Sequence, residues 1–209
     1  MSHSTSITLY LVRHGQTEYN ATGRIQGWMD VPLDEIGLAQ SLLVGKRFAG
    51  KKLAAVYSSP LLRAAVTAHA IAKTCSIELP DIKMDDRLRE YNMGKWQGMT
   101  GDEIVATMPG VRWDIPERPI PDGENAQQMH ERVSAFLHDV LAWHKPGDVV
   151  VAVSHGGTLG AVVGTMLSMP VVRRQPFSFG NTAITKTVYE HGQWHIRSLN
   201  DRCHLRPEG

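Results

Sequence analysis

The sequence predicts an α/β fold: a three-layer α/β/α sandwich in which helices cover both faces of a mostly parallel central sheet. Short apolar runs alternate along the chain with longer stretches in which apolar residues recur every three or four positions. Residues 149–153 contain only valine and alanine, which is typical of a central strand covered on both faces. The length of 209 residues fits one domain of this kind.

The first half of the chain is predicted to contain two strands, each followed by a helix. Residues 7–12 form the first apolar run. The apolar residues Ile36, Leu38, Leu42, Leu43 and Phe48 predict an amphipathic helix that ends near Gly50. Residues 54–57 predict a second short strand, and residues 61–74 a helix with Arg63 in its first turn. We expect residues 84–89 to form a brief strand or extended edge that delivers Glu90 to the next loop.

The second half begins with an insertion at about residues 91–122, where prolines and glycines interrupt any regular periodicity. Its aromatic residues and methionines need a surface to bury against, so we expect a small, partly helical cap over the carboxyl edge of the sheet. Residues 124–144 predict a long helix with one apolar face, 148–154 a central strand and 159–169 another helix. Residues 182–189 and 194–199 predict a hairpin.

Composition excludes several classes of function. There are 22 basic and 21 acidic residues, so the net charge of +1 gives no field that would attract nucleic acid or a membrane. Cys75 and Cys203 lie far apart and without partners at metal-binding spacing, which argues against structural zinc. The amino-terminal residues resemble neither a signal peptide nor a membrane helix, so we expect a cytoplasmic location.

Two of the predicted strands end in a histidine followed by glycine. Arg13-His14 follows the first strand, and His155-Gly156 follows the central strand. The carboxyl ends of parallel strands meet at one edge of a sheet, so neighbouring strands would bring the two imidazoles together across a pocket. A neutral imidazole can attack phosphorus, while an adjacent guanidinium holds the phosphoryl oxygens. Gly156, at the start of a helix, would offer a backbone N–H to an anion.

Arg63 and Glu90 are predicted to reach the same edge of the sheet. A second guanidinium, from Arg63, would complete a clamp around the phosphoryl oxygens, and Glu90 could give a proton to the departing alkoxide. Each residue also has a simpler interpretation. Arg63 could form an exposed salt bridge, Glu90 could be a loop carboxylate, and His14 could be a loop histidine without chemistry.

Four motifs in order along the chain resemble those of the histidine phosphatase superfamily, also called the phosphoglycerate mutase-like family. They are residues 11–20 with 23–33, 58–64, 88–90 with 94–98, and 153–157, and the resemblance looks closest to the broad-specificity phosphatase branch. It implies a single histidine phosphatase domain over residues 1–209, with His14 as phosphoryl acceptor and Glu90 as acid and base. It also implies that the phosphate pocket is formed by Arg13, Arg63 and His155. Asn20 and Gln26 would make lesser contacts with the substrate.

Phosphoryl transfer without a metal or cofactor requires several fixed cations or N–H groups, because charge is spread over three phosphoryl oxygens in the transition state. We expect no metal and no cofactor. We expect the positive groups to be Arg13, Arg63 and a protonated His155, together with the backbone N–H of Gly156. His14 must be neutral at the attacking nitrogen. A backbone carbonyl that accepts from its other nitrogen would fix that tautomer.

The sequence leaves the substrate and the reaction subtype open. Tyr91 begins an amphipathic cap that could accept a small phosphorylated metabolite, such as a sugar phosphate, phosphoserine or 3-phosphoglycerate. The resemblance implies that a cofactor-dependent phosphoglycerate mutase would carry an arginine pair in the cap, and residues 91–122 contain none. Hydrolysis of a phosphomonoester is therefore favoured over mutase activity. A non-catalytic phosphate-sensing module is the third hypothesis, and a homodimer is compatible with the sequence.

Overall fold

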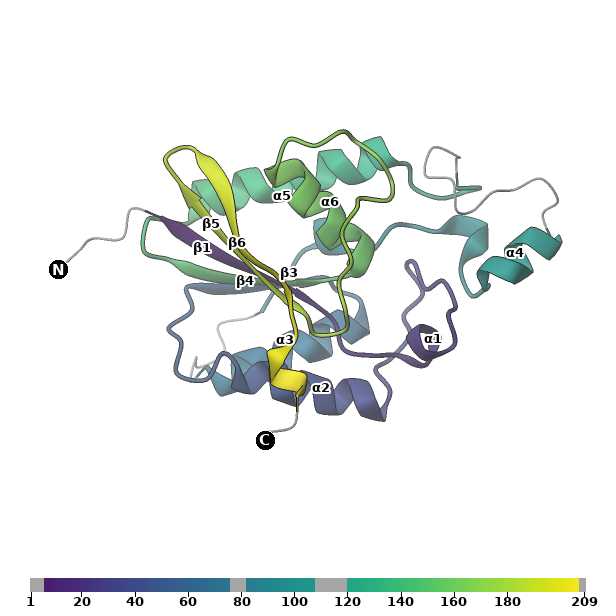
Figure 1. Ribbon diagram of the computed structural model, residues 1–209, viewed down its shortest axis with the longest axis horizontal. Helices are drawn as coiled ribbons and strands as arrows, with labels where there is room; N and C mark the ends of the chain where they lie inside the picture. Colours follow the sequence, from purple (N-terminus) through teal and green to yellow (C-terminus); the bar gives the residue numbers. More distant parts are fainter. Residues whose placement is uncertain (1–5, 76–81, 108–119, 207–209) are drawn as a thin grey trace.

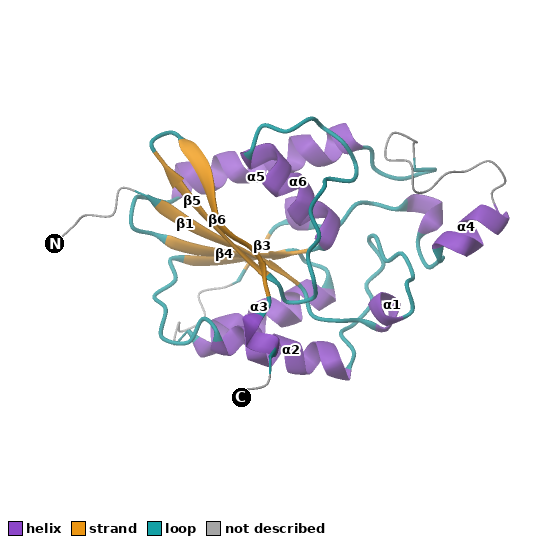
Figure 2. Ribbon diagram, in the orientation of Figure 1, coloured by secondary structure: helices purple, strands orange, loops and turns teal. Residues whose placement is uncertain are grey.

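The computed structural model describes residues 6–75, 82–107 and 120–206, with a six-stranded sheet at the centre (Figures 1 and 2). The strand order is β3-β2-β4-β1-β5-β6. The strands are β1 (Ile7–Arg13), β2 (Ala55–Ser58), β3 (Lys83–Met84), β4 (Val149–Ser154), β5 (Ile184–Glu190) and β6 (Gln193–Asp201). The first four are parallel, and only the hairpin of β5 and β6 introduces antiparallel pairing. The mostly parallel sheet predicted from the sequence is confirmed.

Helices cover both faces of this sheet, as predicted (Figure 1). On one face, α2 (Glu35–Lys46) and α3 (Leu62–Thr74) share an apolar core with alternate residues of the strands, such as Val12 and Val153. On the other face, α5 (Ala126–Trp143) and α6 (Gly156–Met166) pack against Leu11 and Ala152. Burial on both faces explains why residues 149–153 of β4 are all apolar.

The helix α2 lies where the sequence predicts it, but a different face of the helix is buried. Ile36, Leu38, Leu42 and Leu43 are exposed, and the residues that face the protein are Gly37, Ser41, Val44 and Gly45. Small residues let this helix approach its neighbours closely, since a side-chain carbon on Gly45 would lie 2.6 Å from a backbone oxygen of α3. Close packing, and not the apolar periodicity, therefore determines the orientation of α2.

The segment before Glu90 also differs from the prediction. The strand β3 contains only two residues, and a short 3-10 helix, η1 (Asp86–Leu88), replaces the rest of the expected strand. Asp85 caps η1 by accepting from the backbone N–H of Arg87. This turn ends the pairing with β2 and leads the chain toward the carboxyl edge of the sheet.

The predicted cap is partly visible in the described residues. It contains a 3-10 helix, η2 (Gly94–Trp96), and a short helix, α4 (Gly101–Thr107), whereas residues 108–119 of the expected cap lie outside the described part. Trp96, Ile104 and Ile120 form a small apolar cluster of their own. A further short helix, α1 (Glu18–Ala21), lies on the same side of the molecule as α4 (Figure 1).

No helix in the described residues is both long enough and apolar enough to cross a membrane. The cytoplasmic location, the single domain over the whole chain and the homodimer remain predictions.

Candidate active site

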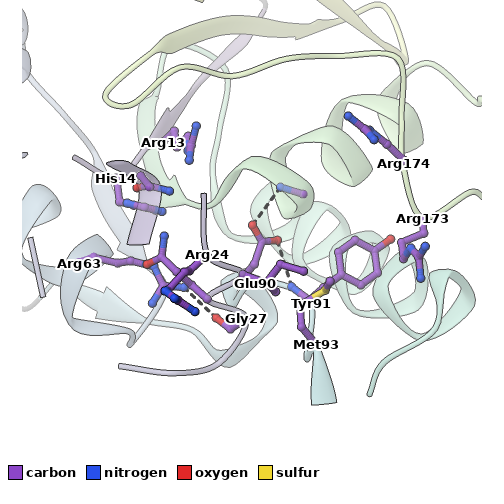
Figure 3. Close-up of a pocket in the computed structure, with 14 residues that line it drawn as sticks. Arg13, His14, Arg24, Gly27, Arg63, Glu90, Tyr91, Met93, Arg173 and Arg174 are labelled. Carbon is purple, nitrogen blue, oxygen red and sulfur yellow. Dashed lines mark hydrogen bonds between the residues drawn. The ribbon is translucent and has the colours of Figure 1, made fainter. Parts of the chain in front are cut away.

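A pocket of about 290 Å³ lies beyond the carboxyl ends of the parallel strands (Figure 3). Seven of the residues singled out from the sequence line it: Arg13, His14, Asn20, Gln26, Arg63, Glu90 and Tyr91. Of the remaining two, His155 contacts the ring of His14 from a fully buried position. Gly156 lies beside the guanidinium of Arg13, and the next residue, Gly157, lines the pocket. The structure therefore brings the predicted set together, while the roles of these residues in a reaction remain a prediction.

The register of the two central strands places the two histidines side by side. Arg13 pairs with Ser154 in the parallel ladder of β1 and β4, so His14 and His155 leave the sheet at the same level. The N–H of His14 still donates to the carbonyl of Ser154 at 3.0 Å. The two ring centroids are 5.1 Å apart, with the rings tilted by 57°. This pairing was expected from the repeated histidine-glycine pattern at the ends of both strands.

The His14 ring is fixed in one tautomer. Its Nδ1 lies 2.6 Å from the carbonyl oxygen of Gly15, and because a carbonyl can only accept, Nδ1 carries the proton. Burial lowers the pKa of His14 well below 6.5, and the nearby cations Arg13 and Arg63 lower it further. The neutral ring therefore has an unprotonated Nε2, which is the form that a nucleophile requires.

His155 differs from the expectation that it is a cation. Burial lowers its pKa well below 6.5, and Arg63 and the other nearby positive groups act in the same direction. The ring of His155 is therefore neutral in the unliganded protein. Its Nε2 lies 2.8 Å from Oγ of Ser59, whereas its Nδ1 is buried without a hydrogen-bond partner among the described residues.

Backbone carbonyls hold the two arginines beside His14. Arg13 donates from Nη1 to the carbonyl of Phe179 at 2.6 Å. Arg63, at the start of α3, donates to the carbonyls of Met29 and Gly27 at 2.7 and 2.8 Å. In the part of the chain that the structure describes, the buried Nε of each has no partner. Burial lowers the pKa of Arg63 to about 10, so its charge persists near neutral pH but is poorly compensated. A phosphoryl group would supply the missing acceptors.

The carboxylate of Glu90 lies at the amino-terminal end of α6. It accepts backbone N–H groups from Gly157, Thr158 and Tyr91, each at 3.0 Å, and the hydroxyl of Thr158 at 3.2 Å. Gly157 is required here, because a side-chain carbon at this position would lie 2.6 Å from the Glu90 oxygen. The helix end thus binds a carboxylate from the protein itself, and it orients Glu90 within the pocket.

Two side chains that the sequence did not identify fix the backbone of Glu90. The indole of Trp28 donates to the Glu90 carbonyl at 2.6 Å, and Arg132 of α5 donates to the same oxygen at 3.0 Å. Glu124 holds Arg132 in turn through contacts of 2.6 and 2.9 Å to both of its oxygens. Trp28 lies within a recognised motif, but nothing in the pattern of α5 distinguishes Arg132 from a surface arginine.

The substrate contacts expected of Asn20 and Gln26 are compatible with their positions. Asn20 lies in the first turn of α1, where its side-chain oxygen accepts from the backbone N–H of Thr17 and from the side chain of Asn181. The buried Oε1 of Gln26 has no partner within the described residues. Tyr91 is largely buried against the wall of the pocket. Burial raises the pKa of its hydroxyl, and the neighbouring Glu90 raises it further.

Three further arginines form what we call the outer wall of the pocket, namely Arg24, Arg173 and Arg174. Arg24 makes a bidentate ion pair with Glu103 of α4, at 2.8 and 3.0 Å. The guanidinium of Arg173 lies 5.2 Å from the ring centre of Trp96. Arg173 and Arg174 were missed because they follow α6 in an irregular segment, where no periodicity indicates which way a side chain points. In the described residues, no group of three or more His, Cys, Asp or Glu side chains is arranged to hold a metal ion.

A family model described as the histidine phosphatase superfamily (branch 1) matches residues 9–202. The chain belongs to the histidine phosphatase superfamily. The resemblance drawn from the four motifs is confirmed, and so is the enzyme class, a phosphatase of the histidine phosphatase type.

Proteins named as phosphoglycerate mutases and proteins named as phosphatases are both similar to the chain. A probable phosphoglycerate mutase, GpmB, from Salmonella arizonae is 36% identical over 90% of this chain and 87% of that protein. A mycobacterial glucosyl-3-phosphoglycerate phosphatase in complex with VO3 has a TM-score of 0.83 and 30% identity, over 93% of this chain and 99% of that one. A phosphoserine phosphatase mutant from Entamoeba histolytica, in complex with phosphoserine, has a TM-score of 0.78 and 27% identity, over 96% and 100%.

Proposed function

We propose that this histidine phosphatase hydrolyses a small phosphomonoester through a phosphohistidine intermediate on His14. The observation that supports this most strongly is the hydrogen bond from Nδ1 of His14 to the Gly15 carbonyl, which leaves Nε2 unprotonated between two arginines. The pocket volume of 290 Å³ lies near the lower end of the roughly 300 to 1,000 Å³ usual for ligand sites, which favours a small metabolite.

In the first half-reaction, the Nε2 lone pair attacks phosphorus and the bond from phosphorus to the alcohol oxygen breaks. Glu90, protonated at this stage, gives its proton to the departing oxygen. Arg13 and Arg63 neutralise the charge that spreads over the phosphoryl oxygens. The products of this step are the free alcohol, the Glu90 carboxylate and phosphorylated His14.

In the second half-reaction, water attacks the phosphorus of phosphohistidine and gives a proton to Glu90. The bond from phosphorus to Nε2 breaks, which returns neutral His14 and releases inorganic phosphate. Glu90 thus acts first as an acid and then as a base, and its fixed position at the start of α6 suits both steps.

Ser59 has a positioning role in this scheme. Its Oγ accepts the backbone N–H of Leu61 at 3.3 Å and lies 2.8 Å from Nε2 of His155. We infer that its hydroxyl donates to Nε2, so that the proton of neutral His155 resides on Nδ1. That N–H can then donate to a phosphoryl oxygen.

The test is to trap the intermediate. Enzyme mixed with a ³²P-labelled phosphomonoester and quenched in alkali is expected to carry label that is stable to base and labile to acid, as phosphohistidine is. The His14→Ala variant should carry none. Label on another residue, or hydrolysis without any labelled protein in a rapid quench, would refute the proposal. The reaction is expected to continue in EDTA, because the protein supplies the cations.

The second candidate is phosphoglycerate mutase activity, which the name of the Salmonella relative favours. The absence of an arginine pair from residues 91–122 favours hydrolysis. A coupled assay for conversion of 3-phosphoglycerate to 2-phosphoglycerate, run beside a phosphate-release assay, separates the two. The presence of both His14 and Glu90 argues against a non-catalytic phosphate sensor.

A further inference from the structure

The pocket holds more positive charge than one phosphoryl group requires. Five of the lining residues are arginines, and Glu90 is the only carboxylate among the described lining residues. Arg13 and Arg63 lie beside His14, and Glu103 compensates Arg24 through two contacts. Arg173 and Arg174 also line the pocket, and the proposed reaction at phosphorus does not use them.

These two arginines lie away from the phosphoryl end of the pocket, which Arg13, His14 and Arg63 line and where His155 packs against His14. Figure 3 shows His14 and Arg63 on one side, Arg173 and Arg174 on the other, and Glu90 between them. A substrate with its phosphoryl group at His14 would therefore extend past Glu90, with its alcohol part toward the arginines.

The neighbours of Arg173 and Arg174 differ, although both residues line the pocket. Arg173 lies against Trp96, which is almost fully buried in the cluster with Ile104 and Ile120, so a cation–π contact ties it to a packed part of the cap. Arg174 is exposed and makes no hydrogen bond or ion pair with a described residue. One guanidinium is thus anchored, and the other is available to a ligand.

We propose that Arg173 and Arg174 form a second anion-binding subsite, and that the natural substrate carries a carboxylate or a second phosphate on its alcohol part. This inference rests on the proposed function, because it assumes that the phosphoryl group binds at His14. A guanidinium presents parallel N–H groups that match the two oxygens of either anion. The subsite would select among phosphomonoesters without taking part in bond breaking.

The test compares substrates that differ only in the second anion. Phosphoserine against phosphoethanolamine, and 3-phosphoglycerate against glycerol 3-phosphate, test the carboxylate; fructose 1,6-bisphosphate against fructose 6-phosphate tests the second phosphate. Each is assayed with the native enzyme, Arg173→Gln, Arg174→Gln and the double variant. Arg197→Gln is the matched control, because Arg197 pairs with Glu190 beside the hairpin turn, near the amino end of β1.

The double variant is expected to lose about 10- to 100-fold in kcat/KM for the substrates with a second anion, the cost of removing hydrogen bonds to a charged group. Its kcat/KM for the matched partners should change less than about threefold, and the control should leave all values unchanged. The substrate pair whose two members the double variant no longer distinguishes by kcat/KM shows whether the second anion is a carboxylate or a phosphate. Equal losses for both members of every pair, or no preference in the native enzyme, would overturn the inference and leave the proposed hydrolysis intact.

Binding provides a readout that does not need turnover. Calorimetric titration of the His14→Ala variant should give a lower Kd for phosphoserine than for phosphoethanolamine, and adding Arg173→Gln and Arg174→Gln should remove that difference. If p-nitrophenyl phosphate is not hydrolysed by the native enzyme, the proposed function fails. The calorimetric difference would still decide whether the second subsite exists, and equal affinities would refute it.

Discussion

The two ends of the pocket are built in different ways. At the phosphoryl end, the functional groups come from the ends of β1 and β4 and the first turn of α3, are buried, and are oriented largely by backbone carbonyls. At the outer wall, Arg24 and Arg173 come from irregular segments and contact side chains of the cap, namely Glu103 and Trp96. In the proposed function, the sheet thus carries the groups that react at phosphorus, whereas loops carry the groups that contact the alcohol.

The largest expected effect tests the phosphoryl end. Replacing His14 with alanine should lower kcat by at least about 10⁴-fold for every phosphomonoester, since loss of a nucleophile removes the covalent route whatever the alcohol. His138→Ala is the matched control, because His138 has 82% of its side chain exposed on α5. Steady-state assays and circular dichroism on both variants check this. More than a few per cent of residual activity in a folded His14→Ala protein would remove His14 from the nucleophile role.

The effect of Glu90→Gln on substrates with different leaving groups should show whether Glu90 donates a proton or only positions other groups. Loss of the acid is expected to slow hydrolysis of phosphoserine about 10²-fold or more, because an alkoxide leaves poorly without a proton. p-Nitrophenyl phosphate should lose less than about tenfold, since its leaving group needs little assistance. Equal losses for the two substrates would mean that Glu90 only organises the end of α6.

The success of the sequence interpretation follows the same division between the two ends. His14 and His155 could be placed because each ends a short apolar strand, and parallel pairing then brings them together. Arg173 could not be placed, because its position depends on an irregular segment and on packing against Trp96. The prediction for the buried face of α2 was wrong because close packing is a property of the assembled fold. Burial likewise lowers the pKa of His155 in the protein alone, which the sequence could not indicate.

Ser59→Ala is expected to have a smaller effect at the phosphoryl end. Without the hydroxyl, His155 can place its proton on either nitrogen, and we expect kcat to fall about tenfold, the size of one lost hydrogen bond. Ser59→Thr, which keeps the hydroxyl, should restore most of the activity. Nitrogen NMR of His155 should report a change of tautomer in the alanine variant alone, which a purely structural role for Ser59 would not produce.

The smallest expected effect is a loss of stability in acid, to which the phosphoryl end contributes two buried histidines. The pKa values of His14 and His155 are both well below 6.5 in the folded protein, so between those values and 6.5 the unfolded chain binds more protons than the folded one. The free energy of unfolding therefore decreases as the pH falls below about 6.5. Above that pH both rings are neutral in the folded and the unfolded state, and this loss is absent.

Thermal unfolding of the native protein, His14→Ala and His138→Ala at pH 7.5 and 5.5 measures this contribution. The native protein and His138→Ala should lose similar amounts of Tm on acidification, because this substitution leaves both buried histidines in place and removes an exposed side chain. His14→Ala should lose less, since one buried group no longer takes up a proton on unfolding. If His14→Ala became more sensitive to acid than the native protein, the buried, neutral state of the nucleophile would be wrong. The comparison between the two ends would then lose its physical basis.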